Sequence, residues 1–398
     1  EFEQPRATTA DFEDARAQAA HALAAPLTLT FQDRRWSVEN SQIASMMSFE
    51  RRDGRPAVLS LNPGILGGTF AQLAAEINQP VTNARFNWVG NGVRPIRESQ
   101  EGRELDLAEL RKLVVQRLIT DNHVIALPVT VTRPAVASED APQLGIKELV
   151  REGRTTVAGV PEKQYNIALA ASRLHGVVVP PGGTFSFNSE VGPTTLDAGF
   201  KTGWGIEQSG SGARTVPAVA GGICQVATTL FHPVFNAGYA IEERHWHLYW
   251  LPSYGQPPLG MKGLDATVDE DSGLDFQFIN TTPDNLLIQS RVEGGALIFG
   301  LYGTKPTWKV DIEGPIITDV IPANRAVVSQ AEPSMPVGRS LQVESAQDGF
   351  VSIIVRTVTQ GEEVRTLRMR SNYIASRNVV LYGTGGRTGV PQPPRQES

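Results

Sequence analysis

Cys224 is the only cysteine among 398 residues, and it follows a pair of glycines in the segment Gly221-Gly222-Ile223-Cys224. The apolar residues behind it recur at helical spacing, which predicts a helix that begins here and carries the thiol in its first turn. Unpaired backbone N–H groups and the positive end of the helix dipole favour a thiolate at such a position. The chemistry that we expect is nucleophilic attack by sulfur.

The segment Arg244-His245-Trp246-His247 and the later Asp265 provide the groups that such a nucleophile needs. The pattern over 239–250 predicts a strand, on which His245 and His247 share one face. We take His247 as the general base and His245 as its polar neighbour, although either could serve. Asp265 would orient the imidazole and stabilise its charged form. The alternatives are structural or metal-binding histidines and an aspartate that merely forms a turn.

Further residues of the same segments are candidates for substrate binding. Arg244 can bind a carboxylate in bidentate fashion, or form a surface salt bridge instead. Gly222 leaves room for a substrate backbone, and the N–H groups of Cys224 and Gln225 are expected to point at a developing oxyanion. Thr228 adjoins the cysteine on the predicted helix, with packing as its alternative role.

We predict no cofactor and no metal. Cys224, His245, His247 and Asp265 could in principle supply four zinc ligands, but a cysteine at a helix start does not require a metal. A single cysteine excludes disulfides within the chain and any multi-cysteine metal site.

Composition limits the class of protein. Hydrophobic residues make up 40% and charged residues 20% of the chain, as in ordinary globular proteins. The net charge of −6 gives no reason to expect nucleic-acid binding. No apolar run approaches the roughly 18 residues that span a bilayer, and no signal peptide is visible. Because the chain begins abruptly at Glu1, we expect any export signal or anchor to lie outside it.

The periodicity predicts an α+β protein of several domains. Helical spacing occurs at 11–24, 41–47, 70–77, 106–118 and 164–174, the glycine-rich stretch 195–217 predicts a surface loop, and alternating β patterns dominate after residue 309. The predicted parts are an N-terminal helix and linker (1–24), a small α/β domain (25–158), a mixed α/β domain (159–306), an all-β module (307–384) and a Pro/Gly-rich tail (385–398).

Five motifs in order give this chain a family resemblance. They are Gln164-Tyr165-Asn166-Ile167, Pro181-Gly182-Gly183-Thr184-Phe185-Ser186-Phe187-Asn188, Gly221-Gly222-Ile223-Cys224-Gln225-Val226-Ala227-Thr228-Thr229-Leu230, Glu243-Arg244-His245-Trp246-His247 and Gly263-Leu264-Asp265-Ala266-Thr267-Val268. Together they resemble the VanW domain over about residues 160–305. The preceding segment resembles a peptidoglycan-binding domain, and the following segment looks like a G-five domain of bacterial surface proteins.

The resemblance implies an exported cell-envelope protein linked to glycopeptide resistance. Some VanW-domain proteins are assigned L,D-transpeptidase activity, a transferase reaction in which the cysteine of the domain is the nucleophile. Carried over to this chain, that role falls on Cys224. The expected partners are peptidoglycan stem peptides and glycan, with no nucleic acid, and with a membrane only through an anchor outside this chain. The expected location is extracellular, in the cell wall.

Two other functions remain open from the sequence. A peptidase resembling the NlpC-type wall hydrolases would form the same thioester on Cys224 and release it to water. A non-catalytic peptidoglycan-binding protein would keep this cysteine buried and inert.

Overall fold

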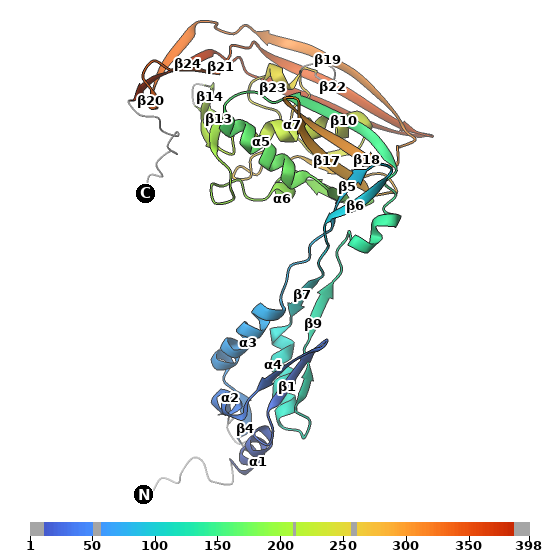
Figure 1. Cartoon of the computed structure of the whole chain (residues 1–398), viewed down its shortest axis with the longest axis vertical. Coiled ribbons are helices and arrows are strands. Elements are labelled where there is room, and N and C mark those ends of the chain that lie inside the picture. The colour runs from blue at the N-terminus through green and yellow to red at the C-terminus, as the bar shows by residue number, and fades with distance from the viewer. Residues whose placement is uncertain (1–11, 51–56, 210–211, 256–260, 386–398) are drawn as a thin grey trace, which may run out of the picture. The chain divides into compact units, whose positions relative to one another are not determined.

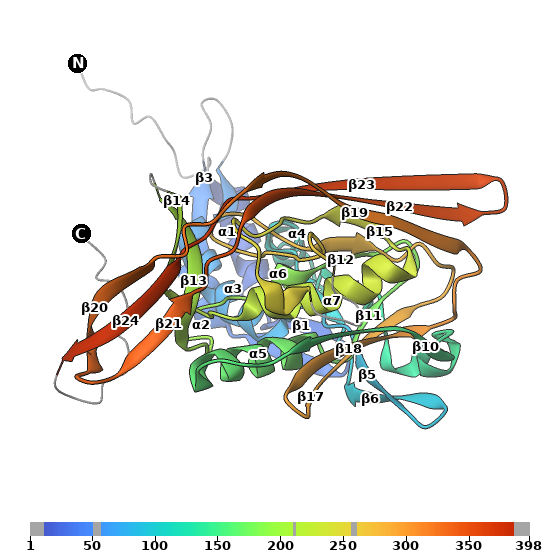
Figure 2. The same cartoon turned by 90° about the horizontal axis from the view of Figure 1, so that it is seen from above.

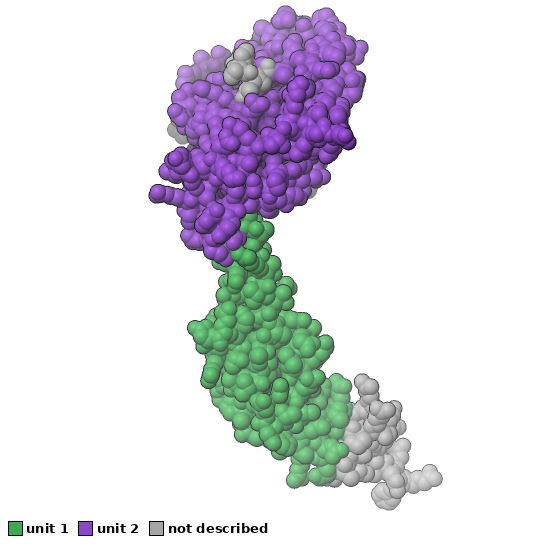
Figure 3. All heavy atoms as spheres, turned by 90° about the vertical axis from the view of Figure 1, so that its right-hand side faces the viewer, with its two compact units in different colours: residues 1–83, 99–137 green, residues 84–98, 138–398 purple. Residues whose placement is uncertain are grey.

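The computed structural model describes residues 12–50, 57–209, 212–255 and 261–385, which belong to two compact units (Figure 3). The first unit draws on 1–83 and 99–137, and the second on 84–98 and 138–398. The fold is mixed α/β and multidomain, as predicted. Within the described ranges, no helix has the length and apolar character needed to cross a membrane.

The first unit packs helices on small sheets. In it, β1 pairs antiparallel with β2 and parallel with β8. Leu27 and Leu29 alternate into the core, as the period-two pattern predicts. Asp106 caps its last helix by accepting a hydrogen bond from the Glu109 N–H at 2.8 Å. Its elements are α1 (Glu13–Ala22), β1 (Leu27–Phe31), β2 (Arg34–Val38), α2 (Asn40–Met46), β3 (Met47–Glu50), β4 (Val58–Leu61), α3 (Pro63–Ile77), β7 (Gly102–Leu105), α4 (Leu107–Leu118), β8 (Val124–Ala126) and β9 (Val129–Thr132).

The second unit is built around one long apolar helix, α7, which lies in its middle in Figures 1 and 2. A sheet of order β10-β18-β17-β11 and a sheet of order β12-β16-β15 contribute to its core. Its elements up to residue 303 are β5 (Arg85–Val89), β6 (Gly92–Arg97), η2 (Ser138–Gln143), β10 (Glu148–Thr156), α5 (Pro161–Leu174), β11 (Val177–Val179), β12 (Thr184–Ser186), α6 (Phe187–Val191), β13 (Thr202–Ser209), β14 (Gly212–Val219), α7 (Ile223–Ala237), β15 (Ala240–Glu243), η3 (Pro252–Tyr254), β16 (Gln277–Ile279), β17 (Leu286–Glu293) and β18 (Ala296–Gly303).

The described residues after 303 form strands and no helix, as the alternating pattern predicts. They make a sheet of order β19-β22-β23 and a sheet of order β20-β24-β21. Ile354 and Met369 from these strands belong to the same core cluster as α7. The strands are β19 (Lys309–Ile321), β20 (Val327–Pro336), β21 (Ser340–Glu344), β22 (Gly349–Gln360), β23 (Glu363–Tyr373) and β24 (Asn378–Gly385).

The two compact units do not divide at the predicted domain boundaries. The range 84–98 and the range 138–158 belong to the second unit, because β10 pairs along its length with β18. The strands after 303 join that unit as well, since they share its core. Hydrogen bonding between segments far apart in the chain, which local patterns do not encode, therefore decides these borders.

Helix α7 begins where the glycines predict it. Gly222 precedes it with φ of 112°, a conformation that favours glycine, and Gly238 ends it. Pro233 lies inside the helix and lacks the N–H of a helical hydrogen bond, but the helix continues four residues further, to Ala237. Gly153 of β10 lies against this point, where a Cβ would approach the Pro233 ring and the Thr229 carbonyl to 2.4 and 2.5 Å. The strand therefore packs closely on the turn that the proline leaves without a hydrogen bond.

Two predicted segments differ in the structure. The expected loop 195–217 contains the strands β13 and β14, which pair from Thr202 with Val219 to Ser209 with Gly212. The expected strand 239–250 is regular only in β15, which ends at Glu243. The histidine segment after it is irregular, apart from a single bridge between His245 and Thr267.

Phe231 tests the core of α7. Its ring is fully buried and lies 5.5 Å from the Phe276 ring and 5.6 Å from the Phe235 ring, centroid to centroid. Replacing Phe231 by Ala leaves a cavity, so we expect the free energy of unfolding to fall by about 3–5 kcal/mol in urea titrations followed by tryptophan fluorescence. Leu196→Ala, at an exposed position of the same unit, is the control. Equal stability of the two variants would contradict this packing.

Candidate active site

A stripe of three side chains on α7 holds the chain segment 264–268. Residues four apart on a helix share a face, and here that face meets backbone atoms of every second residue of the segment. Cys224 Sγ lies 3.4 Å from the Val268 carbonyl oxygen. Thr228 Oγ1 donates to the Ala266 carbonyl and accepts from the Ala266 N–H, both at 3.0 Å. His232 Nε2 lies 2.7 Å from the Leu264 carbonyl oxygen.

Asp265 and Thr267, which lie between the three residues held by α7, contact His247 and the thiol. Thr267 Oγ1 donates to Cys224 Sγ at 3.6 Å. Burial by itself raises the pKa of the Cys224 thiol, but the hydrogen bond and positive charge of His247, with smaller contributions from Val268 and Thr267, lower that pKa overall. Cys224 is only partly buried. The surroundings of the sulfur therefore favour its thiolate form, and His247 is the group that contributes most to this effect.

His247 and Asp265 complete a chain of three residues. His247 Nδ1 lies 2.6 Å from Asp265 Oδ2, which also accepts from the His247 backbone N–H at 3.0 Å. This contact leaves Nε2 for the thiol. Burial opposes the charged imidazole, but its hydrogen bonds to Asp265 and Cys224 raise the pKa of His247 to about 9. The predicted base and its orienting acid thus lie together with the cysteine.

The second carboxylate oxygen of Asp265 is satisfied as well. Arg244 Nη2 donates to Oδ1 at 2.6 Å, and the Tyr373 hydroxyl donates to Oδ1 at 2.5 Å. Although burial raises the pKa of Asp265, Arg244, His247 and Tyr373 together lower it far below its usual range. Asp265 is fully buried and ionised, and its charge is what allows His247 to remain an imidazolium.

The end of β23 holds the histidine segment from the other side. The Asn372 carbonyl accepts from Trp246 Nε1 at 2.9 Å, and the Ile374 N–H donates to the Leu248 carbonyl at 2.9 Å. Tyr373 lies between these two contacts and reaches Asp265. The sheet β19-β22-β23 therefore helps to position the candidate site.

His245 does not join the other site residues. Its Nε2 lies 2.8 Å from Glu243 Oε1, and 37% of its side chain is exposed. The prediction that both histidines share one strand face is wrong, because β15 ends at Glu243 and His247 lies in no strand. His247 alone is the candidate base.

The residues predicted to bind substrate have other contacts in the structure. Arg244 is 5% exposed and donates to Asp265, to the Gly263 carbonyl and to Ser371 Oγ, so it positions the acid instead of meeting a substrate carboxylate. Thr228 is fully buried on the segment 264–268.

The glycine and glutamine at the start of α7 also serve the fold. The buried Gln225 side chain donates to Thr155 Oγ1 and to the Thr156 carbonyl, and its backbone N–H donates to the Gly222 carbonyl at 3.1 Å. That N–H is therefore engaged, which corrects its expected role toward an oxyanion. Gly222 keeps its conformational role at the helix start.

Sequence reasoning missed three residues at this site. Thr267 and Tyr373 hydrogen-bond the thiol and the acid. Lys163 of α5 packs beside Gly222, and burial lowers its pKa. Thr267 stands inside a quoted motif and was within reach of sequence reasoning. The other two give no local signal, because their contacts join distant parts of the chain.

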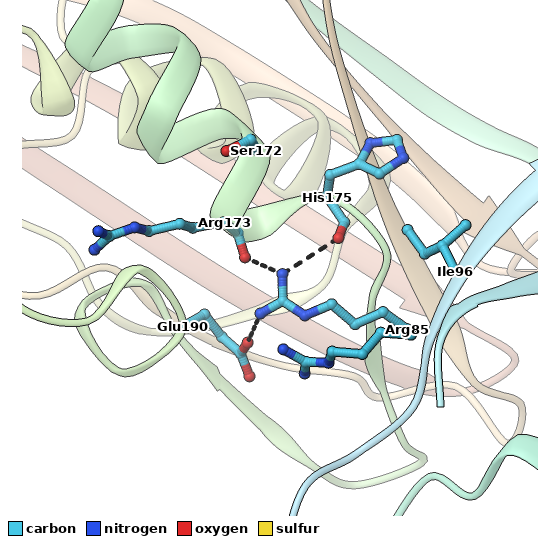
Figure 4. A pocket seen from close by; sticks show the side chains of 7 residues that line it. Arg85, Ile96, Ser172, Arg173, His175 and Glu190 are labelled. Carbon is cyan, nitrogen blue, oxygen red and sulfur yellow. Dashed lines mark hydrogen bonds and ion pairs between the residues drawn. The ribbon is translucent and has the colours of Figure 1, made fainter. Parts of the chain in front are cut away.

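A cavity of about 400 Å³ lies elsewhere in the second unit (Figure 4). In it Arg85 donates to Glu190 at 3.0 Å and to the carbonyls of Arg173 and His175. None of the predicted site residues lines it. Within the part of the chain that the structure describes, no three His, Cys, Asp or Glu side chains gather as a metal site.

Comparison with known proteins confirms the family resemblance and its extent along the chain. Residues 162–302 match the family model described as VanW like protein. This segment is a VanW-like domain. Cys224, His247 and Asp265 all belong to the VanW-like domain, whereas Tyr373 comes from the strands beyond it.

Two curated relatives share sequence with this chain. The chain is 34% identical over 180 residues to the uncharacterized protein YoaR of Bacillus subtilis strain 168, a match that covers 45% of this chain and 56% of that protein. It is 30% identical over 144 residues to the vancomycin B-type resistance protein VanW of Enterococcus faecalis, covering 36% of this chain and 50% of that protein. The chain thus spans about half the length of these relatives.

Similarity to solved structures is weak. An L,D-transpeptidase of Enterococcus faecium, solved as a cysteine-to-serine mutant, is 11% identical with a TM-score of 0.23, over 52% of this chain and 77% of that chain. The G5 domain of an IgA1 protease is 20% identical with a TM-score of 0.12, over 21% of this chain and 99% of that chain. At these scores the similarity says nothing about the chemistry of the site.

Replacing Asp265 by Asn tests the electrostatic link. The neutral amide no longer favours the imidazolium, so the pKa of His247 falls, the pKa of Cys224 rises and less thiolate exists at neutral pH. We expect the rate of alkylation by iodoacetamide at pH 7 to fall by about tenfold or more, and the rates of variant and parent to converge at high pH. Asp269→Asn, at an exposed position directly after the segment 264–268, should leave the rate unchanged. A parental rate in Asp265→Asn would refute the link, provided that circular dichroism shows a folded chain.

Replacing each histidine in turn tests which one serves Cys224. His247→Gln removes the imidazolium next to the sulfur, so we expect its alkylation profile to shift toward higher pH. His245→Gln should keep the parental profile, because that ring contacts Glu243. The reverse pattern, with only His245→Gln shifted, would show that the base is misassigned.

Proposed function

We propose that this chain is an L,D-transpeptidase-like enzyme of the cell envelope, which acts on peptidoglycan stem peptides through a thioester on Cys224. The observation that carries the proposal is the 2.6 Å contact between the His247 imidazole and the buried carboxylate of Asp265, in an arrangement where that imidazole lowers the pKa of the Cys224 thiol. A cysteine paired with a charged imidazole is a nucleophile, whereas a passive wall-binding protein has no need of that pairing. The class of substrate rests on the family resemblance and on the relative named for vancomycin resistance.

The first half of the reaction follows from the positions of these groups. The Cys224 thiolate attacks the carbonyl carbon that joins the L-centre of the diamino acid to D-alanine. Its electron pair forms a C–S bond, and the carbonyl π electrons move onto oxygen. When the tetrahedral intermediate collapses, the C–N bond breaks and the leaving amine takes a proton from His247 Nε2. D-alanine departs, and a thioester remains on Cys224.

The second half restores the enzyme. The side-chain amine of a neighbouring stem attacks the thioester carbon and gives a proton to the neutral His247. The C–S bond breaks, an amide cross-link forms, and the thiolate–imidazolium pair returns. Asp265 keeps its charge throughout and steadies the imidazolium in both halves.

Incubation of the full chain with purified tetrapeptide muropeptides, followed by mass spectrometry, tests this function. We expect cross-linked dimers that have lost one D-alanine, and no dimers with Cys224→Ala. Thermal melting of the variant should match the parent, so that loss of product reports on chemistry.

Other products would point to the other functions. Trimmed monomers without dimers would replace the amine by water and make the chain a peptidase. Absence of both products, with slow labelling of Cys224, would contradict any acyl transfer and favour a binding protein. Dimers formed by Cys224→Ala would show that the nucleophile is another group.

A further inference from the structure

Tyr254 lies beside the catalytic imidazole and has no role in the mechanism above. It ends the short helix η3, where its N–H donates to the Leu251 carbonyl at 3.0 Å. The residue is 5% exposed, and its ring lies 5.2 Å from the His247 ring, centroid to centroid. Its position next to His247 is therefore fixed by packing.

The Tyr254 ring belongs to a small aromatic cluster. Tyr254 packs with Trp250, Phe350 and Tyr373 in a buried cluster of its own. The Trp250 ring lies 5.6 Å from the Tyr373 ring, and Tyr373 in turn hydrogen-bonds Asp265. The tyrosine is thus anchored to the same elements that position the acid.

The hydroxyl of Tyr254 is nevertheless unused. Within the described part of the chain no group forms a hydrogen bond with it, and its oxygen is not sealed from solvent, because it is absent from the fully enclosed polar atoms without a partner. A buried tyrosine normally finds a partner for its hydroxyl. A side chain that is more than nine-tenths buried and keeps a free donor points to a ligand as the missing partner.

The hydroxyl of Tyr254 remains protonated at neutral pH. Burial raises the pKa of Tyr254 well above its ordinary value, and the negative charges of Cys224 and Asp265 raise it further. At neutral pH Tyr254 is therefore a neutral hydrogen-bond donor next to the His247 ring, 5.2 Å away from centroid to centroid.

One of the two backbone N–H groups that the sequence predicts as oxyanion donors is already engaged, because the Gln225 N–H donates to the Gly222 carbonyl. We propose that the Tyr254 hydroxyl donates a hydrogen bond to the oxyanion of the tetrahedral intermediate formed on Cys224, which makes Tyr254 a catalytic residue. This role rests on the proposed acyl transfer. As the thiolate attacks, negative charge leaves sulfur and appears on the carbonyl oxygen, where a fixed neutral donor stabilises it.

Tyr254→Phe separates this role from packing, because the ring stays on His247 and only the hydroxyl is lost. Two reagents are compared on the full chain. p-Nitrophenyl acetate transfers its acetyl group to sulfur through an oxyanion and releases nitrophenolate, whereas iodoacetamide alkylates sulfur by displacing iodide without one. We expect acylation to slow by about a hundredfold, with alkylation unchanged at each pH.

Tyr302→Phe, which changes a tyrosine stacked on Trp88 away from the site, is the matched control and should leave both rates unchanged. Equal acylation rates in Tyr254→Phe and the parent would overturn the proposal. So would an equal loss of acylation and alkylation, which would mean that the hydroxyl supports the thiolate itself. Suppose that Tyr254→Phe slows acylation of Cys224 as expected, but the parent forms no muropeptide product. The substrate assignment would then fail, and the role of Tyr254 would stand.

Discussion

The buried negative charge of Asp265 is the constraint on which the site depends. An ionised carboxylate inside a protein is costly unless every oxygen has donors. Here the donors come from Arg244, from the side chain and backbone of His247, and from Tyr373. Because all of them must converge on one point, the histidine segment and the end of β23 are fixed relative to each other.

Helix α7 supplies the complementary constraint. A helix advances by about 6 Å over four residues, and an extended chain by a similar distance over two, so a polar stripe on one can follow alternate residues of the other. Cys224, Thr228 and His232 use this match to hold the segment 264–268. The same segment turns Asp265 toward His247 and Thr267 toward the sulfur. The three residues of the candidate site, Cys224, His247 and Asp265, are thus positioned by a repeat of backbone contacts.

The sequence predicted that Cys224 lies at the start of a helix, and it singled out His247 and Asp265, which the structure joins by a hydrogen bond. These residues lie in motifs whose local spacing is informative, such as the glycines before Cys224. It misassigned His245, Arg244, Gln225 and Thr228, because period-two alternation fails where a strand ends early and because a polar side chain gives no sign of whether it faces a ligand or the protein. The sequence could not predict the contacts of Tyr373 and Tyr254, because these contacts depend on how the sheet β19-β22-β23 packs. The loop expected at 195–217 shows that a glycine-rich stretch can still pair as a hairpin.

The central claim is that Cys224 and His247 form a thiolate–imidazolium pair. The most direct measurement is the ultraviolet absorbance of the thiolate as a function of pH, with Cys224→Ala as the blank. With a single cysteine in the chain, the whole signal belongs to this residue. We predict a thiolate that forms well below the ordinary thiol value of about 8.5. Titration at or above that value would contradict the pair and, with it, the proposed enzyme.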